Sequence, residues 1–143
     1  MTGIASPLIL HASCVAVQGR AVLILGASGA GKSGLALQLM ALGGGLVADD
    51  RTCLARGADG LVASSPSAIR GRIEARFVGL LAADPVPEAP VALAVDLDRV
   101  ETERLPPRRE ARFLDVVVPL LRRVDRAYFP AAILAHVIHG RTD

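Results

Sequence analysis

Unbroken apolar runs alternate with glycine-rich and charged segments along the 143 residues, and this alternation predicts an α/β fold. Residues 21–25 and 91–95 are apolar at every position, as is typical of strands covered on both faces of a sheet. Residues 8–17 predict one or two further strands, and residues 46–48 predict a short one. Residues 35–42 consist mostly of strong helix formers and run into a glycine triplet, so they predict a helix that ends there.

The middle of the chain predicts a hairpin followed by a short helix. Residues 53–64 predict the hairpin, because two strand-like segments flank a turn bounded by glycines. Residues 65–72 begin with Ser-Pro-Ser, a sequence that favours the start of a short helix. Residues 73–81 fit a strand or a helix, and the pattern leaves both open.

In the second half of the chain, prolines and charged residues indicate where connections interrupt the predicted strands and helix. Residues 84–90 contain three prolines and predict a surface connection without regular structure. Residues 99–112 are charged, include a proline pair and predict an exposed loop. Residues 113–120 contain a last strand, and Pro130 is expected to start a closing helix. No internal repeat is visible, and the sequence predicts a single domain over residues 1–143, with a mixed sheet and flanking helices.

Composition limits the classes of partner. An apolar content of 52% favours a folded domain with a buried core over disorder. A net charge of +2 is too small to indicate a nucleic-acid footprint, and 3% aromatic residues offer few platforms for base stacking. We therefore expect no nucleic acid among the partners.

The sequence also predicts a cytoplasmic location. Cys14 and Cys53 have no metal-like spacing and are expected to be small buried residues in a reduced compartment. The N-terminus lacks the basic and apolar regions of a signal peptide. No apolar run reaches the roughly 18 residues of a membrane span, so no membrane contact is expected.

One motif indicates chemistry directly, a phosphate-binding loop of the pattern G-x-x-x-x-G-K-[ST]. In such a loop, glycines let several backbone N–H groups point at phosphate oxygens, and the following helix adds its positive N-terminal end. The predicted strand before it and helix after it are the context that the motif requires. The residues of the loop are Gly26, Ala27, Ser28, Gly29, Ala30, Gly31, Lys32 and Ser33.

The lysine of this loop stands out in an arginine-rich chain. Lys32 is the only lysine, while arginine occurs at fifteen positions, which indicates a role for a compact charge that arginine cannot fill. The Asn-Lys-x-Asp element that reads guanine is excluded, because no second lysine exists. A GTPase of that kind is therefore excluded as well.

Carboxylates that could place a metal or accept a proton follow two predicted strands. Asp49 and Asp50 end the strand at 46–48, and such an adjacent pair indicates a cation or proton nearby. Asp96 ends the strand at 91–95, and either a turn-forming or a metal-binding role remains open for it. His11 precedes Gly26 by fifteen residues and is expected on a strand beside the loop strand.

Taken together, these residues resemble the catalytic domain of HPr kinase/phosphorylase, a bacterial family that phosphorylates a serine of the phosphocarrier protein HPr. The family has a histidine, then GxSGxGKS, a helix, a glycine and L-[IV]-A-D-D; here His11, the loop, Gly43 and residues 46–50 follow in that order and at that spacing. Its later signatures, E-I-R-G-L-G and D-R-L-G, correspond to residues 74–79 and 103–106.

The resemblance implies a serine kinase mechanism. Asp50 would be the base that takes the proton from the protein serine, with Asp49 supporting it. His11 would stand near this pair and tune it. Arg104 would reach toward the transferring phosphoryl group.

The resemblance also implies ligands, partners and a fold. Lys32 would hold the β and γ phosphates of ATP, and Ser33 and Glu74 would hold Mg²⁺. The partners would be HPr and a nucleotide triphosphate, with a homo-hexamer as the assembly and a regulatory role in carbon metabolism. The fold would be the P-loop mixed sheet with flanking helices of the HPr kinase catalytic domain, which is PEP carboxykinase-like.

The chain departs from the family pattern at several positions, and these departures narrow the activity that the resemblance implies. Gly34 stands where the family has an acidic residue, and Ala12 stands where it has glycine. Residues 119–123 replace the P-V-x-P-G-R loop that is tied to phosphorolysis, which weighs against phosphorylase activity. The regulatory domain of the long members is not in this sequence, so a short-form kinase is expected, without control of the long-form kind.

Two other functions remain open from the sequence. A small-molecule kinase could keep the same loop and use residues 99–112 as a lid over a metabolite. A non-catalytic nucleotide sensor would follow if the altered regions around Glu74 and Arg104 meant lost chemistry.

Overall fold

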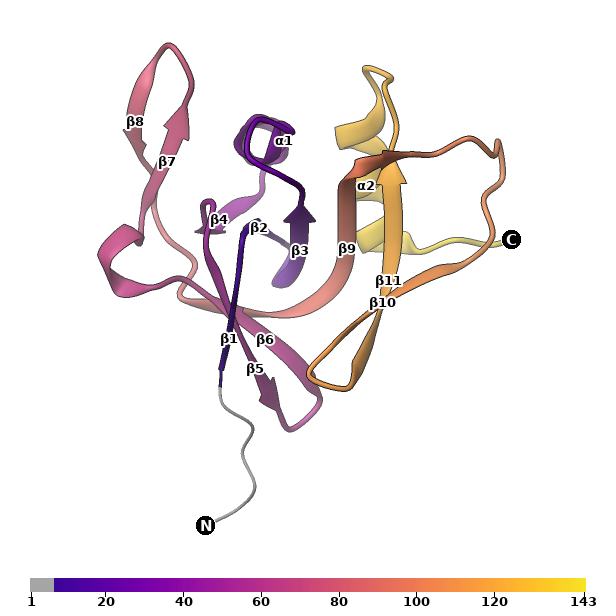
Figure 1. Cartoon of the computed structure of the whole chain (residues 1–143), viewed down its shortest axis with the longest axis horizontal. Helices are drawn as coiled ribbons and strands as arrows, with labels where there is room; N and C mark the ends of the chain where they lie inside the picture. Colours follow the sequence, from indigo (N-terminus) through magenta and orange to yellow (C-terminus); the bar gives the residue numbers. More distant parts are fainter. Residues whose placement is uncertain (1–6) are drawn as a thin grey trace.

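The computed structural model describes residues 7–143, which form a mixed β-sheet with two α-helices (Figure 1). The order of the main sheet is β1-β5-β6-β9-β3-β2-β4, and β10 and β11 join it beside β9. The strands are β1 (Leu8–Leu10), β2 (Ala12–Val17), β3 (Arg20–Leu25), β4 (Gly45–Ala48), β5 (Thr52–Gly57), β6 (Gly60–Ser64), β7 (Arg72–Ala75), β8 (Gly79–Ala82), β9 (Glu88–Val100), β10 (Arg109–Phe113) and β11 (Val116–Arg123). The helices are α1 (Lys32–Ala41), α2 (Phe129–His139) and a short 3₁₀ helix, η1 (Ser67–Ile69).

Three parallel strands form the centre of the sheet and fix where the loops meet. β3 and β11 both pair with β9 in parallel, while β2 pairs antiparallel with β3 and β4. The carboxyl ends of β3, β9 and β11 therefore lie at one edge, and the glycine-rich loop starts at that edge. The apolar runs at 21–25 and 91–95 are confirmed as strands of this centre.

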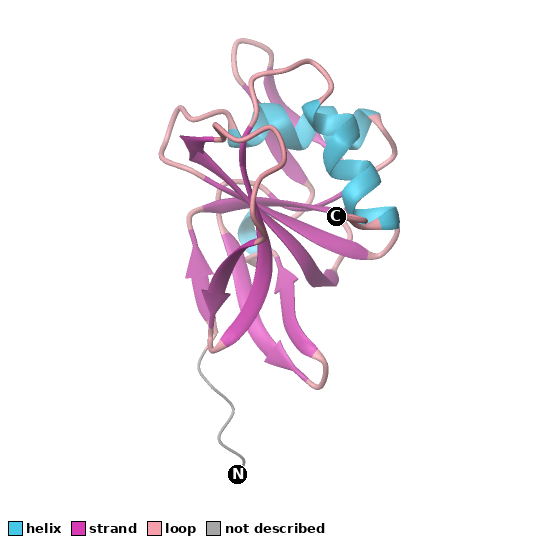
Figure 2. Cartoon of the chain, turned by 90° about the vertical axis from the view of Figure 1, so that its right-hand side faces the viewer, coloured by secondary structure: helices cyan, strands magenta, loops and turns pink. Residues whose placement is uncertain are grey.

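Side-chain alternation divides the core between the two faces of the sheet. On β2, Val15 and Val17 belong to a core cluster shared with α1 and α2, while Cys14 and Ala16 belong to a second cluster on the other face. Both helices lie on the first face (Figure 2). The helices predicted at 35–42 and from Pro130 are confirmed as α1 and α2, and Pro130 lies in the first turn of α2. The helix predicted at 65–72 is only the short 3₁₀ helix η1, because Arg72 already begins strand β7.

The expected connection at 84–90 is only partly right. Glu88 to Pro90 already belong to β9 and pair antiparallel with β6, and Ala89 is buried. Proline is tolerated there because β9 pairs with β3 only from Val91 onward, so Pro90 has one neighbouring strand. The result is a strand of 13 residues that curves from β6 into the centre of the sheet (Figure 1).

Two further expectations are corrected or resolved. The ambiguous residues 73–81 form a hairpin, β7 and β8, and Ile73 of this hairpin is buried in the core. The expected loop at 99–112 is shorter than predicted, because β9 continues to Val100 and β10 begins at Arg109. No helix in residues 7–143 is long and apolar enough to cross a membrane.

An ion pair closes the loop between β9 and β10. Arg109 donates from Nε to Glu101 Oε1 at 3.0 Å and from its terminal nitrogen to Glu101 Oε2 at 3.1 Å. The backbone N–H groups of Thr102 and Glu103 also donate to this carboxylate. The Arg109 hydrogen bonds, helped by these backbone donors, lower the pKa of Glu101 to about 2.

Glu101 should therefore make stability depend on pH in the acid range. Since the folded pKa is depressed below the ordinary value of 4.5, the contribution is present above that pH and is lost as the pH falls toward about 2. We expect Glu101→Gln to be less stable than the parent at pH 7, with the difference shrinking as the pH falls through this range. Urea unfolding of both proteins between pH 7 and pH 2.5 measures this difference in the free energy of unfolding.

The comparison isolates Glu101 from another acid that titrates in the same range. Arg141 lowers the pKa of Asp143 to about 2 as well, but Asp143 is present in both proteins and cancels in the difference. A stability difference that stays constant from pH 7 to pH 2.5 contradicts the prediction.

Candidate functional site

The glycine-rich loop has the shape of a phosphate cradle. Gly29 and Gly31 have φ values of 86° and 101°, which residues with a side chain rarely adopt. A Cβ atom built on either glycine would meet no atom within 4 Å, so open space lies where phosphates would sit. No side chain caps α1 within the described chain, and its first backbone N–H groups are available to an anion.

Lys32 lies inside this cradle and is almost fully buried. Its Nζ donates to the carbonyl oxygens of Gly26 at 2.8 Å and Ala27 at 3.3 Å. The same nitrogen is 3.9 Å from Asp50 Oδ1, so the lysine charge faces the aspartate pair. The side chain is thus held at the loop by groups that a phosphate oxygen could replace.

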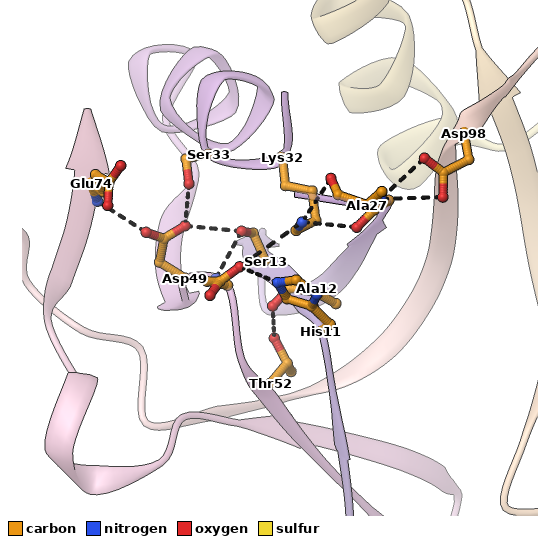
Figure 3. A network of polar contacts seen from close by, with 12 residues as sticks. His11, Ala12, Ser13, Ala27, Lys32, Ser33, Asp49, Thr52, Glu74 and Asp98 are labelled. Atoms are coloured by element: carbon orange, nitrogen blue, oxygen red, sulfur yellow. Dashed lines mark hydrogen bonds and ion pairs between the residues drawn. The ribbon is translucent and has the colours of Figure 1, made fainter. Parts of the chain in front are cut away.

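Asp49 connects the loop to β2 and to the β7–β8 hairpin (Figure 3). Its Oδ1 accepts hydrogen bonds from Ser33 Oγ at 2.6 Å and from Ser13 Oγ at 2.9 Å. Its Oδ2 accepts one from the backbone N–H of Glu74 at 2.9 Å. Asp49 is 8% exposed, and these three donors compensate for the burial of its charge.

Asp50 faces the solvent side of the same site and pairs with His11. His11 Nε2 lies 2.6 Å from Asp50 Oδ1, and with its proton on Nε2 the ring donates to the carboxylate. Asp50 has a φ of 64°, and its backbone N–H donates to Ser13 Oγ at 3.0 Å. The carboxylate is 56% exposed, so an incoming hydroxyl group can reach it.

Ser13 was not predicted as a site residue, although it holds the aspartate pair in place. Its hydroxyl is fully buried, donates to Asp49 and accepts from the N–H of Asp50. One atom therefore fixes the carboxylate of one aspartate and the backbone of the next. The available signal was a polar residue two positions after His11 in an otherwise apolar strand.

Asp98 is a second residue that the sequence reasoning missed. Both of its carboxylate oxygens accept from the N–H of Ala27, at 3.0 and 3.2 Å, and so hold the start of the loop. Asp96, for which a metal role was open, accepts from the backbone N–H of Asp98 at 2.9 Å. Asp96 lies inside β9 and pairs with both neighbouring strands, so the expectation that it ends the strand is wrong, and its contact is with the backbone of its own strand.

A pocket of about 560 Å³ lies between the loop, the aspartate pair and the β7–β8 hairpin. Its wall on the hairpin side includes Glu74, Arg76 and Val78. The remaining lining residues are Ser28, Gly29, Gly31, Lys32, Ser33, Gly34, Leu37, Asp49, Asp50 and Ala75. The pocket thus brings together most of the residues that the sequence singled out.

Arg104, a predicted catalytic residue, does not line this pocket. It lies in the loop between β9 and β10 and lines a separate hollow with Thr102, Glu103 and Leu105. Figure 1 shows that this loop leaves the end of β9 on the side of β11, whereas α1 lies on the side of β3. The E-R-L-P resemblance at 103–106 therefore has no contact with the other site residues in this chain.

The donor set fits magnesium bound together with a nucleotide. Mg²⁺ in kinase sites usually takes one or two carboxylates, and phosphate oxygens and water supply the rest. Ser33 and Glu74 line the same pocket as the cradle and offer a hydroxyl and a carboxylate. Among residues 7–143, no three acidic, histidine or cysteine side chains gather as an all-protein metal site would require.

Comparison with known families identifies the family of this chain. A family model described as the HPr Serine kinase C-terminal domain matches residues 3–86, more than half of the chain. The matched span contains the loop, both aspartates, Ser13 and Glu74. The predicted resemblance is confirmed.

Curated relatives match over a limited part of their own length. The HPr kinase/phosphorylase of Caldanaerobacter subterraneus subsp. tengcongensis is 44% identical over 79 residues, which cover 54% of this chain and 26% of the relative. The HPr kinase/phosphorylase of Cupriavidus necator is 35% identical over 119 residues, 76% of this chain and 36% of the relative. The chain spans about a quarter to a third of these relatives.

A solved structure covers nearly the whole fold. The Hpr(Ser) kinase/phosphatase from Coxiella burnetii matches with a TM-score of 0.74 and 26% identity, over 92% of this chain and 94% of that chain. The predicted fold, a mixed α/β sheet with flanking helices, is confirmed. At this coverage the match extends well beyond residue 86, where the family model ends.

The Ser13 hydroxyl should contribute measurably to stability. Ser13→Ala removes a buried donor to Asp49 and leaves the N–H of Asp50 without its acceptor in a part-buried position. We expect a loss of about 1–3 kcal/mol in the free energy of unfolding. Urea denaturation measures it, with Ser67→Ala, an exposed serine, as the matched control that changes little. Equal stability of the two variants contradicts the bridging role.

Proposed function

The chain belongs to the HPr serine kinase C-terminal domain family, and we propose that it is an ATP- and Mg²⁺-dependent kinase of a serine in HPr. The observation that carries the proposal is the half-exposed Asp50 carboxylate, 2.6 Å from His11 and 3.9 Å from the Lys32 charge, at the mouth of a phosphate cradle. The names of the relatives, HPr kinase/phosphorylase and Hpr(Ser) kinase/phosphatase, support HPr as the protein substrate.

The cradle would bind the phosphates of the nucleotide. Backbone N–H groups at Gly29 and Gly31 and at the start of α1 would donate to phosphate oxygens. Lys32 would exchange its bonds to the loop carbonyls for bonds to the β and γ phosphates. Asp98 would keep the loop in register through the N–H of Ala27.

Ser33 and Glu74 would hold Mg²⁺. The ion, when bound, neutralises charge on the phosphates during transfer. Asp49 would orient both ligands, because it accepts from the Ser33 hydroxyl and from the backbone of Glu74. This second role for Asp49 comes from its contacts and differs from simple support of Asp50.

Asp50 would act as the general base. The serine Oγ attacks the γ phosphorus, its proton passes to the Asp50 carboxylate, and the bond from phosphorus to the β-phosphate oxygen breaks to release ADP. His11 would hold the carboxylate in position through their short contact. Ser13 would hold the backbone of Asp50 in its left-handed conformation.

We propose only the kinase reaction, phosphoryl transfer from ATP to the serine, and not the reverse phosphorolysis. Residues 119–123, which stand in place of the loop tied to phosphorolysis, belong to strand β11, whose pairing with β9 shifts register between Arg122 and Arg123. Arg104 lies outside the pocket, so a role in transfer would need its loop to come from a second copy or to change position. The homo-hexamer and the single-domain organisation over residues 1–143 are parts of the same proposal.

Replacing the base tests the proposal directly. With ATP labelled in the γ phosphate, the chain should transfer label to a serine of HPr, and Asp50→Asn should lower the rate by about 100-fold or more, as loss of a general base does. ATP binding, measured by calorimetry, should change little, because the amide keeps the size of the side chain.

The exposed Asp59 of the β5–β6 turn offers the matched control, and Asp59→Asn should keep the parent rate. Full activity of Asp50→Asn would refute the base assignment. Turnover of a small-molecule acceptor, with no label on HPr, would replace the proposed substrate.

A further inference from the structure

The β7–β8 hairpin exposes a group of large apolar side chains beside the pocket. Phe77 is fully exposed, Val78 is 74% exposed and Leu80 is 69% exposed. The base of the hairpin is secured differently, since Ile73 and Ala75 are buried and Ile73 packs in the core cluster under α1. We call residues 76–80 the hairpin tip. The base of the hairpin is anchored in the core, and its apolar tip is exposed to solvent.

The backbone at Phe77 is held in a conformation that favours glycine. Its φ is 71°, and the N–H of Val78 donates to the carbonyl of Ala75 at 2.9 Å to close the turn. A bulky residue in the left-handed region is unusual and strained. The E-I-R-G-L-G signature has glycine at this point, where residues 74–79 of this chain have E-A-R-F-V-G. The turn thus carries an aromatic ring at a position where its backbone favours glycine.

The location of the tip indicates what could cover the ring. Arg76 and Val78 line the phosphate pocket, but Phe77 between them does not. A nucleotide bound in the pocket would touch its two neighbours and leave the ring in water. A group that buries Phe77 must therefore extend from the mouth of the pocket over the outside of the hairpin.

We propose that the hairpin tip is a docking surface for the protein that carries the acceptor serine. Phe77 would insert into an apolar patch beside that serine while the hydroxyl enters toward Asp50. Arg76 lies in the tip, and the exposed Arg70 and Arg72 lie before and at the base of the same hairpin, so acidic groups on the partner would complement this side of the molecule. The proposal rests on the proposed function and adds where the protein substrate is held.

A second copy of this chain is the competing occupant. It would present the same arginines to one another, and it would cover the mouth through which the serine must approach Asp50. The protein substrate avoids both conflicts, because it has to reach this mouth in any case. The continuity of the tip with the pocket favours it.

Phe77→Gly is the sharpest test, since it removes the ring and places at φ 71° the residue that this backbone favours. We expect the KM for HPr to rise at least 10-fold, as for the loss of an aromatic interface anchor. The kcat at saturating HPr and the Kd for ATP should stay within about 2-fold, because the ring is outside the pocket. Leu105→Gly, which removes an 80% exposed side chain from another loop, should leave all three constants unchanged.

Each other result is decisive. An unchanged KM for HPr with Phe77→Gly overturns the docking surface while the kinase assignment stands. A weaker Kd for ATP in this variant overturns it in favour of a contact with the nucleotide. A parent oligomer that dissociates on Phe77→Gly, seen by sedimentation with an unchanged KM for HPr, assigns the tip to a second copy. If the unaltered chain transfers no phosphoryl group to HPr, the proposed function fails and this inference fails with it.

Discussion

The buried carboxylate of Asp49 is the constraint on which the rest of the site depends. It accepts hydrogen bonds from β2 through Ser13, from the phosphate loop through Ser33, and from the β7–β8 hairpin through the backbone of Glu74. A nearly buried charge in such a place is tolerated only because donors surround it. The same donors fix the spacing between the cradle, the hairpin and the half-exposed Asp50, so satisfying one charge sets the geometry of the whole pocket.

The sheet supplies the second constraint, through the meeting of parallel strand ends. β3 and β9 run side by side, and therefore the loop that follows β3 comes within reach of Asp98 near the end of β9. β2 and β4 run antiparallel to each other, which places Ser13 on one and the aspartates after the other in contact. The chemistry at this edge thus follows from strand direction and register as much as from the residues themselves.

Sequence reasoning located the parts that are local in the chain and missed those that depend on register. The loop, the pair Asp49-Asp50 and the central strands follow from short patterns, and the predicted approach of His11 to Asp50 is present in the structure. Ser13 and Asp98 act on residues 36 and 71 positions away, and a local pattern does not show which distant residues they contact. The hairpin at 73–81 was ambiguous for a related reason, since its burial comes from packing on α1. Arg104 is a different case, because its motif match lies in a loop that the topology places outside the pocket.

The contacts of His11, Ser13, the loop, Asp49 and Asp50 with one another all fall within residues 11–50, a run of forty positions encoded without interruption. Two later segments complete the site, since the backbone of Glu74 in the hairpin donates to Asp49 and Asp98 of β9 holds the N–H of Ala27. The hairpin tip takes part in neither contact. Substitutions at the tip can therefore accumulate while the contacts that hold the cradle and the aspartate pair stay unchanged.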